Sequence, residues 1–190
     1  MNAPPDAEVP TLALPAGHVG AIRQITPLGL LPATMRVLIG GVVRERADWE
    51  GIICLPDGEQ TLWAHVSARE IVSFQGAASA RLAAAFGVPF EGSCDPVAMD
   101  DTMSRPERLA VQLNSATLAG NTSAIRGHLI GAELAAMRPY WLGQKVVIVA
   151  EASPYAEALS RLGVEVRIAR RAETWHTGLL ALGRAAGMAG

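Results

Sequence analysis

The sequence predicts an α/β fold, and three patterns near its C-terminal end carry that prediction. The segment "KVVIVAE" is a continuous apolar run of the kind found in strands buried in parallel sheets. The next segment, "SPYAEALSRLG", predicts a helix with Ser153 as N-cap, Pro154 at the first helical position and Gly163 just past its end. The segments "VEVRIA" and "AETWHTGLLALGRAAG" then predict a second strand and a final helix. Short connections between these elements predict a right-handed crossover and a C-terminal βαβα unit.

The N-terminal part of the chain predicts fewer regular elements. Residues 1–20 are rich in Pro and Ala, and we expect them to be poorly ordered, which leaves residues 21–190 as a single α/β domain. From Pro32, the segment "PATMRVLIGGVVRERA" has a proline at a suitable helix start and apolar residues at helical spacing. Gly40 and Gly41 weaken this helical pattern, so a strand is the alternative.

The middle of the chain predicts a run of strands. "GIICLP", "QTLWAHV" and "REIVSFQ" have the composition of strands, and the last two are joined by a turn near residues 67–69. Between the first two lies "DG", a hairpin signal, because Gly58 takes a positive φ at little cost. "AASARLAAAFG" predicts a short helix that ends at Gly87.

Residues 88–103 contain Gly, two Pro and three Asp, and predict a loop or a joint between domains. Beyond them, Ser104 and Glu107 have the spacing of a capping box and predict the start of a helix. In the following predicted helix, Gly127 and Gly131 lie four residues apart. They form a smooth strip where another backbone can pack closely.

Composition and charge exclude several classes of protein. The net charge is −2 and the pI about 6.1, without a basic stripe or interleaved aromatic platform, so we expect no nucleic acid partner. No apolar run is long enough to span a bilayer and no secretory signal is visible, so we expect a cytoplasmic protein that does not enter a membrane. The two cysteines and four histidines are far apart in the sequence and predict no metal site.

Two loops are candidates for ligand binding. Ligands of open α/β sheets bind beyond the carboxyl ends of strands, which indicates "AEASP", residues 150–154. Glu151 there would repel an anion by about 3 kcal/mol at about 5 Å and an effective dielectric of about 20. The turn in "LPDGEQTLW" is either a phosphate cradle made of backbone N–H groups or a plain turn. The arginines of "RIARRAE" predict a solvated strand end, with a phosphate-binding patch as the alternative.

Several segments together resemble a known family. "AIRGHLIGAELAAM", "VVIVAEASPYAEALSRLGVEV" and "AETWHTGLLALGRAAG" resemble the C-terminal part of the 2-dehydro-3-deoxygalactonokinase family, sugar-acid kinases of the actin-like ATPase superfamily. "IICLPDGEQTLWAHVSAREIVSF" is similar to the same family, in which a "LPGTHSKW"-like strand and turn takes the place of "LPDGEQTLW". The resemblance implies an actin-like ATPase (ribonuclease H-like) lobe, with a mixed sheet and flanking helices.

The resemblance also implies a function. In the family, ATP phosphorylates a hydroxyl of a 2-keto-3-deoxy sugar acid in a cleft between two lobes. The expected cofactor is Mg-ATP, and the expected partners are the sugar acid and the nucleotide. By resemblance, the residues that would bind phosphate or nucleotide are Gly58, Thr61, Ala150 and Ser153. The sequence identifies no catalytic residue, and in particular no general base.

The chain departs from the family pattern at three places. No "DxGxT/N"-like segment occurs, so the family's opening lobe has no counterpart in these residues. Aligned on the tryptophan, the Thr-His-Ser-Lys positions of the family fall on Glu59, Gln60, Thr61 and Leu62. The nucleotide-side loop carries Glu151 where the family usually has glycine. Each change removes attraction for phosphate or adds repulsion.

Two functions follow as hypotheses. One is a sugar-acid kinase by resemblance. The other is a pseudoenzyme derived from that kinase, which acts as a non-catalytic ligand-binding or protein-interaction domain. Half of the residues are hydrophobic, so we also expect a homodimer or a partner chain that covers an apolar face.

Overall fold

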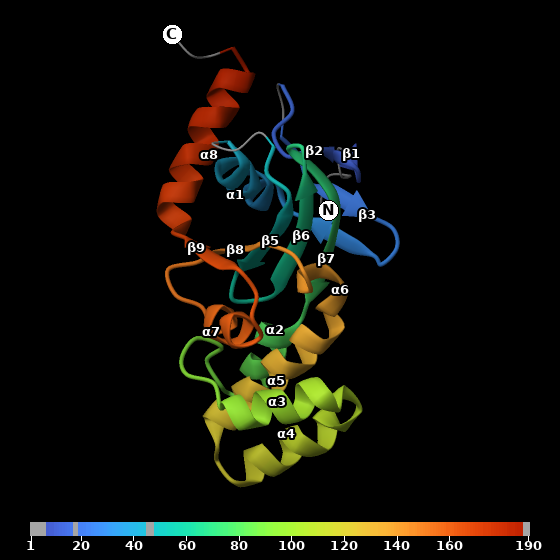
Figure 1. The fold of residues 1–190 in the computed structure, drawn as a ribbon, viewed down its shortest axis with the longest axis vertical. Coiled ribbons are helices and arrows are strands. Elements are labelled where there is room, and N and C mark those ends of the chain that lie inside the picture. Colours follow the sequence, from blue (N-terminus) through green and yellow to red (C-terminus); the bar gives the residue numbers. More distant parts are fainter. Residues whose placement is uncertain (1–6, 17–18, 45–47, 188–190) are drawn as a thin grey trace.

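The computed structural model describes residues 7–16, 19–44 and 48–187 of the chain (Figure 1). Its strands are β1 (Ala7–Glu8), β2 (Thr11–Leu12), β3 (Ile22–Gln24), β4 (Gly29–Leu31), β5 (Gly51–Pro56), β6 (Thr61–Ser67), β7 (Glu70–Ala77), β8 (Val146–Val149) and β9 (Val166–Ala169). Its helices are α1 (Ala33–Val43), α2 (Ser79–Ala85), α3 (Pro96–Ser104), the 3-10 turn η1 (Pro106–Arg108), α4 (Leu109–Leu118), α5 (Thr122–Ala136), α6 (Arg138–Trp141), α7 (Pro154–Arg161) and α8 (Arg171–Ala185). Among these helices none is long and apolar enough to cross a membrane.

A six-stranded mixed sheet with the order β2-β7-β6-β5-β8-β9 forms the centre of the fold. The strands from β2 to β5 pair antiparallel, whereas β5, β8 and β9 pair parallel. A three-stranded sheet with the order β1-β3-β4 accompanies it. The C-terminal βαβα unit predicted from the sequence is confirmed, because β8 and β9 are parallel neighbours and α7 lies between them in the chain.

The central sheet buries both of its faces. Along β5, Ile53 and Leu55 belong to one hydrophobic core, while Ile52 and Cys54 belong to the other. This alternation follows from the two-residue period of a strand. Figure 1 shows α1 and α8 together on one side of the sheet, and α3, α4 and α5 gathered at the end far from the C-terminus.

Glycines let α1 and α8 touch backbone to backbone. A Cβ added at Gly41 would lie 2.1 Å from the carbonyl oxygen of Thr174, and one at Gly178 would lie 2.1 Å from that of Val37. The helix predicted from Pro32 is therefore confirmed, and the strand alternative is wrong. The glycines that weaken the helical propensity of this segment are the positions that its packing requires.

Glycines also allow the backbones of α5 and α3 to pack closely. A Cβ at Gly127 would lie 2.4 Å from the carbonyl oxygen of Asp95, and one at Gly131 would lie 2.3 Å from that of Met99. The close backbone packing predicted for these two glycines is confirmed.

The loop predicted over residues 88–103 is wrong in its second half, where α3 begins at Pro96. The Asp95 carboxylate caps this helix by accepting hydrogen bonds from the backbone N–H groups of Val97 and Ala98 at 2.9 and 3.3 Å. The capping box predicted at Ser104 is also wrong. Ser104 is the last residue of α3, and its hydroxyl donates back to the Asp100 carbonyl at 2.8 Å.

The N-terminal residues also differ from expectation, since β1 and β2 lie within the segment 1–20. Buried Arg36 on α1 holds part of this segment. Its guanidinium donates to the carbonyls of Leu12, Ala13 and Gly20 at 2.7, 3.2 and 2.8 Å. Three backbone acceptors are thus satisfied by one buried side chain. Residues 1–6 and 17–18 of the segment lie outside the described part of the chain.

Candidate functional site

A cleft of about 1080 Å³ opens at the carboxyl end of the parallel strands. Its walls come from the β5–β6 turn, the loop before α3, the β8–α7 loop, and the starts of α1 and α8. Of the four residues predicted to bind phosphate or nucleotide, Gly58, Ala150 and Ser153 line this cleft. The topology therefore brings together two loops that are more than 90 residues apart in the sequence.

The β5–β6 turn is closed by its own carboxylate. Asp57 Oδ1 accepts hydrogen bonds from the backbone N–H groups of Glu59 and Gln60 at 3.0 and 2.8 Å, and the Asp57 N–H donates to the Gln60 carbonyl at 3.0 Å. Gly58 has a φ of +84°, which a glycine adopts without strain. An incoming phosphate would have to displace the Asp57 carboxylate to reach these two N–H groups.

Thr61 lies outside the cleft. It is the first residue of β6, is fully buried, and its Oγ1 is 3.0 Å from the Tyr155 hydroxyl. The pleat of β6 points this side chain into the sheet's core. Thr61 is thus the one predicted site residue that the structure separates from the other three.

In the β8–α7 loop, Ser153 accepts hydrogen bonds from the first N–H groups of α7. Ser153 Oγ accepts from the Tyr155 N–H at 3.3 Å, and the Ser153 carbonyl accepts from the Ala156 N–H at 3.1 Å. Pro154, the first helical residue, has no N–H to offer. The Ala150 N–H donates to the carbonyl of Ala169, the last residue of β9, at 3.1 Å. The N–H groups of Ala150, Tyr155 and Ala156 therefore already have partners.

Carboxylates outnumber cations in the cleft. In the described part of the chain, the charged residues that line it are Asp57, Glu91, Glu151 and Glu157 and one cation, Arg171. This arginine is the first residue of α8 and donates from Nη1 to the Pro56 carbonyl at 3.1 Å. The sequence predicts a solvated strand end for Arg171, and this prediction is wrong because α8 packs its first turn against the cleft.

A buried polar cluster lies behind the cleft floor. The Glu133 carboxylate accepts from Trp63 Nε1 and from the Tyr155 hydroxyl, both at 2.8 Å. The Trp63 and Tyr155 rings meet edge to face with centroids 5.7 Å apart. All three side chains are buried. The cluster links β6, α5 and α7, and its members are recognisable only once these elements are assembled.

Burial shifts the pKa values in this cluster. Burial raises the pKa of Glu133 above 4.5, although hydrogen bonds from Ser79, Trp63, Tyr155 and Thr61 oppose the shift. Burial also raises the pKa of the Tyr155 hydroxyl well above its usual range, and the nearby Glu133 charge adds to that effect. The three side chains are buried, and Tyr155 also contributes to the lining of the cleft, so the cluster supports this part of the cleft wall.

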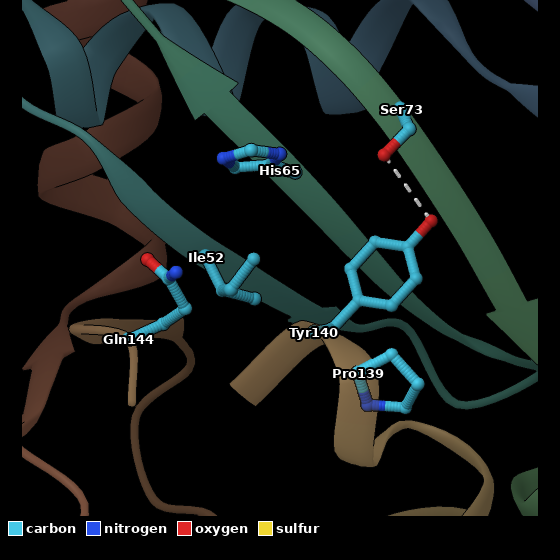
Figure 2. Close-up of a pocket in the computed structure, with 6 residues that line it drawn as sticks. All are labelled: Ile52, His65, Ser73, Pro139, Tyr140 and Gln144. Carbon is cyan, nitrogen blue, oxygen red and sulfur yellow. Dashed lines mark hydrogen bonds between the residues drawn. The ribbon is translucent and has the colours of Figure 1, made fainter. Parts of the chain in front are cut away.

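A second, smaller pocket of about 150 Å³ lies against the opposite end of the central strands (Figure 2). His65 and Ser73 from neighbouring strands line it with Tyr140 and Gln144 from α6 and the turn after it. The Tyr140 hydroxyl donates to Ser73 Oγ over a long 3.4 Å, and buried His65 Nε2 has no hydrogen-bond partner among the described residues. Glu50 Oε1 is 3.8 Å from that nitrogen. The space is sufficient for ordered water.

The cleft does not fit the phosphates of Mg-ATP. Two N–H groups of the predicted cradle bind the Asp57 carboxylate, and the first-turn donors of α7 are used by Ser153. Across residues 7–16, 19–44 and 48–187, no three His, Cys, Asp or Glu side chains come close enough to hold a metal ion. Phosphoryl transfer needs cations that neutralise charge, whereas the described residues of the cleft set four carboxylates against Arg171.

Comparison with known proteins supports the family resemblance. The family model described as 2-keto-3-deoxy-galactonokinase matches residues 104–182 of the chain. No curated protein matches. A crystal structure from Sinorhizobium meliloti, provisionally described as a 2-dehydro-3-deoxygalactonokinase protein, superposes with a TM-score of 0.78 at 16% identity and covers 94% of this chain and 73% of that chain. The resemblance to this family and the predicted fold, an α/β lobe with a mixed sheet and flanking helices, are confirmed.

Proposed function

We propose that this 2-dehydro-3-deoxygalactonokinase-like protein binds a small molecule in its cleft and does not transfer a phosphoryl group from ATP. The observation that carries the proposal is the Asp57 carboxylate, which occupies the two turn N–H groups where a phosphate would bind. Phosphoryl transfer is achieved by positioning and by neutralising charge, and one carboxylate at the cradle opposes both.

The cleft remains suited to a ligand. Its volume exceeds that of a typical small-molecule pocket, and its walls combine apolar side chains with a few polar groups. A rigid sheet and two helices, α7 and α8, support these walls. Binding without phosphoryl transfer therefore agrees with the shape of the cleft as well as its charge.

ATP-dependent phosphorylation of a 2-keto-3-deoxy sugar acid is the second candidate function. The family model match favours it, because residues 104–182 include α7 and the first part of α8, which both border the cleft. In this candidate, Mg-ATP would lie between the turn at residues 57–61 and the loop at residues 150–153. The Asp57 hydrogen bonds would then have to open on binding.

Phosphorus NMR separates the two functions. The purified chain is incubated with Mg-ATP and 2-dehydro-3-deoxygalactonate at high protein concentration. We expect the ATP resonances to stay unchanged over hours. A new phosphomonoester resonance that depends on both the protein and the sugar acid would overturn the proposal and favour the kinase function.

Pairing with a second copy or a partner chain is a further part of the proposal. Leu179 and Leu180 on α8 and Ile168 on the edge strand β9 are 44%, 47% and 44% exposed. Exposed apolar side chains that gather into a patch are commonly covered by another chain. Multi-angle light scattering should therefore give a mass above that of the monomer, and a monodisperse monomer would contradict the expectation.

A further inference from the structure

We infer that the cleft selects an uncharged, hydroxyl-bearing molecule with an apolar face, such as a nucleoside, and that each phosphate added to this ligand weakens binding. The inference rests on the proposed function, since it names the ligand class of the same cleft. It reverses the order of affinity expected of a kinase, in which the phosphates contribute to nucleotide binding.

The charges of the cleft support this order. Among the residues that the structure describes, four carboxylates line it against one guanidinium, that of Arg171. The guanidinium is itself held by the Pro56 carbonyl, so it is directed toward the wall of the cleft. An anion that enters the cleft meets an excess of negative charge, and this repulsion grows with the number of phosphates it carries.

Three backbone donors beside the cleft are already engaged and are not offered to a phosphate. The N–H groups of Glu59 and Gln60 bind Asp57, and that of Tyr155 binds Ser153. A phosphate offers only acceptor oxygens, so it needs such donors. A hydroxyl, in contrast, donates to a carboxylate, and a charge-assisted bond of this type is stronger than a neutral one. The carboxylates of Glu91, Glu151 and Glu157 can therefore accept hydrogen bonds from ligand hydroxyls, but they repel phosphates.

The apolar walls suit the rest of such a ligand. Phe90 and Trp175, 85 positions apart in the chain, line the cleft together with Leu38 and Val149. The Phe90 ring also contacts the buried Tyr155 ring, with centroids 6.0 Å apart and a tilt of 51°. Aromatic rings supported in this way present faces on which a planar base can stack.

The experiment is an NMR titration of the amide-labelled chain with adenosine, AMP, ADP and ATP, at low salt and without Mg²⁺. We expect the amides of Gly58, Ala150 and Ala172 in the cleft to shift while that of Gln144 in the second pocket does not. We expect adenosine to bind most tightly and each phosphate to weaken binding about threefold or more.

A matched pair of variants tests the electrostatic cause. Glu151→Gln removes one exposed carboxylate of the cleft and should narrow the ratio of adenosine to ATP affinity about threefold. Glu107→Gln makes the same change on η1, outside the cleft, and should leave the ratio unchanged. ATP binding tighter than adenosine, or no adenosine binding at millimolar concentration, would overturn the inference. Neither result needs phosphoryl transfer, so the phosphorus NMR experiment tests the proposed function separately.

Discussion

Replacing Glu133 by alanine should destabilise the protein substantially, because the side chain is the central acceptor of the buried cluster. It is 4% exposed and accepts from Trp63 Nε1 and the Tyr155 hydroxyl. In the alanine variant, the Tyr155 hydroxyl can turn to Thr61 Oγ1, which already lies 3.0 Å away. Among the described residues, Trp63 Nε1 donates to Glu133 alone, so the alanine variant leaves this N–H unpaired in the core.

The magnitude follows from two losses. An unpaired buried N–H costs about 1–3 kcal/mol. The space left by the removed side chain adds about 0.8 kcal/mol for each buried methylene group. Release of a partly charged group from the core offsets some of this cost. We therefore expect the free energy of unfolding to fall by about 2–4 kcal/mol.

Glu133→Gln is the informative companion. Its Oε1 can still accept from Trp63, and its Nε2 can donate to the Tyr155 hydroxyl, which then donates to Thr61. We expect its free energy of unfolding to lie within about 1 kcal/mol of the wild type at neutral pH. Glu107→Ala, an exposed site on η1, should change it by less than about 0.5 kcal/mol.

The pH dependence gives a second readout. Burial raises the pKa of Glu133, so folding favours the protonated carboxyl. This contribution to stability is fully present below the unfolded value near 4.5 and is lost as the pH rises through the raised folded value. The glutamine variant lacks this loss, so its stability relative to the wild type should increase as the pH rises above about 4.5.

Urea unfolding followed by tryptophan fluorescence, at several pH values, measures all of these free energies. An alanine variant within about 0.5 kcal/mol of the wild type would refute the reasoning, because the Trp63 N–H would then have another partner. A glutamine variant whose relative stability does not change with pH would refute the assigned direction of the Glu133 pKa.

Three more predictions concern other parts of the fold. Gly178→Ala should lower the free energy of unfolding by more than about 2 kcal/mol, since the new Cβ would lie 2.1 Å from the Val37 carbonyl oxygen. Gly183→Ala on the same helix places its Cβ where no atom lies within 4 Å, and it should raise the free energy of unfolding by up to about 1 kcal/mol. Equal thermal stabilities for these two variants would contradict the helix contact. Asp57→Asn keeps the side-chain acceptor of the turn, so it should preserve the free energy of unfolding and tighten ATP binding about threefold. Asp57→Ala removes the acceptor and should lower the free energy of unfolding by about 1 kcal/mol. Calorimetry measures both the binding and the unfolding. His65→Leu should change the free energy of unfolding by less than about 1 kcal/mol, because the buried Nε2 of His65 makes no hydrogen bond with the described residues. A decrease above about 2 kcal/mol in urea unfolding would contradict this and would indicate an ordered water as its partner.

Much of the fold could be predicted from local patterns. The apolar run of β8, the caps of α7 and the strands around the β5–β6 turn are encoded within short stretches, because caps, turns and periodicity act between near neighbours in the chain. The start of α3 was missed although Asp95 and Pro96 form a cap and first-turn pair, since the density of Pro and Asp in that segment also suits a loop. Gly41 differs because it lowers the helical propensity of its own segment but allows a close contact with α8, more than 130 residues away in the chain.

The candidate site was predicted less completely. The sequence indicated the two loops that carry Gly58 and Ala150, and it indicated that their charges oppose phosphate. Whether the turn is a cradle depended on where the Asp57 carboxylate points, and the structure directs it into the turn's own N–H groups.

Sequence alone thus determined strands β5 to β9, helices such as α7 and α8, and the acidic character of the loops, because these properties belong to neighbouring residues. The tertiary structure alone decided that Thr61 is buried against Tyr155 and that Arg171 borders the cleft. It also brought Glu133 to Trp63 across 70 positions of the chain. Such contacts depend on how the sheet and helices pack, and no pattern within a single segment carries that information.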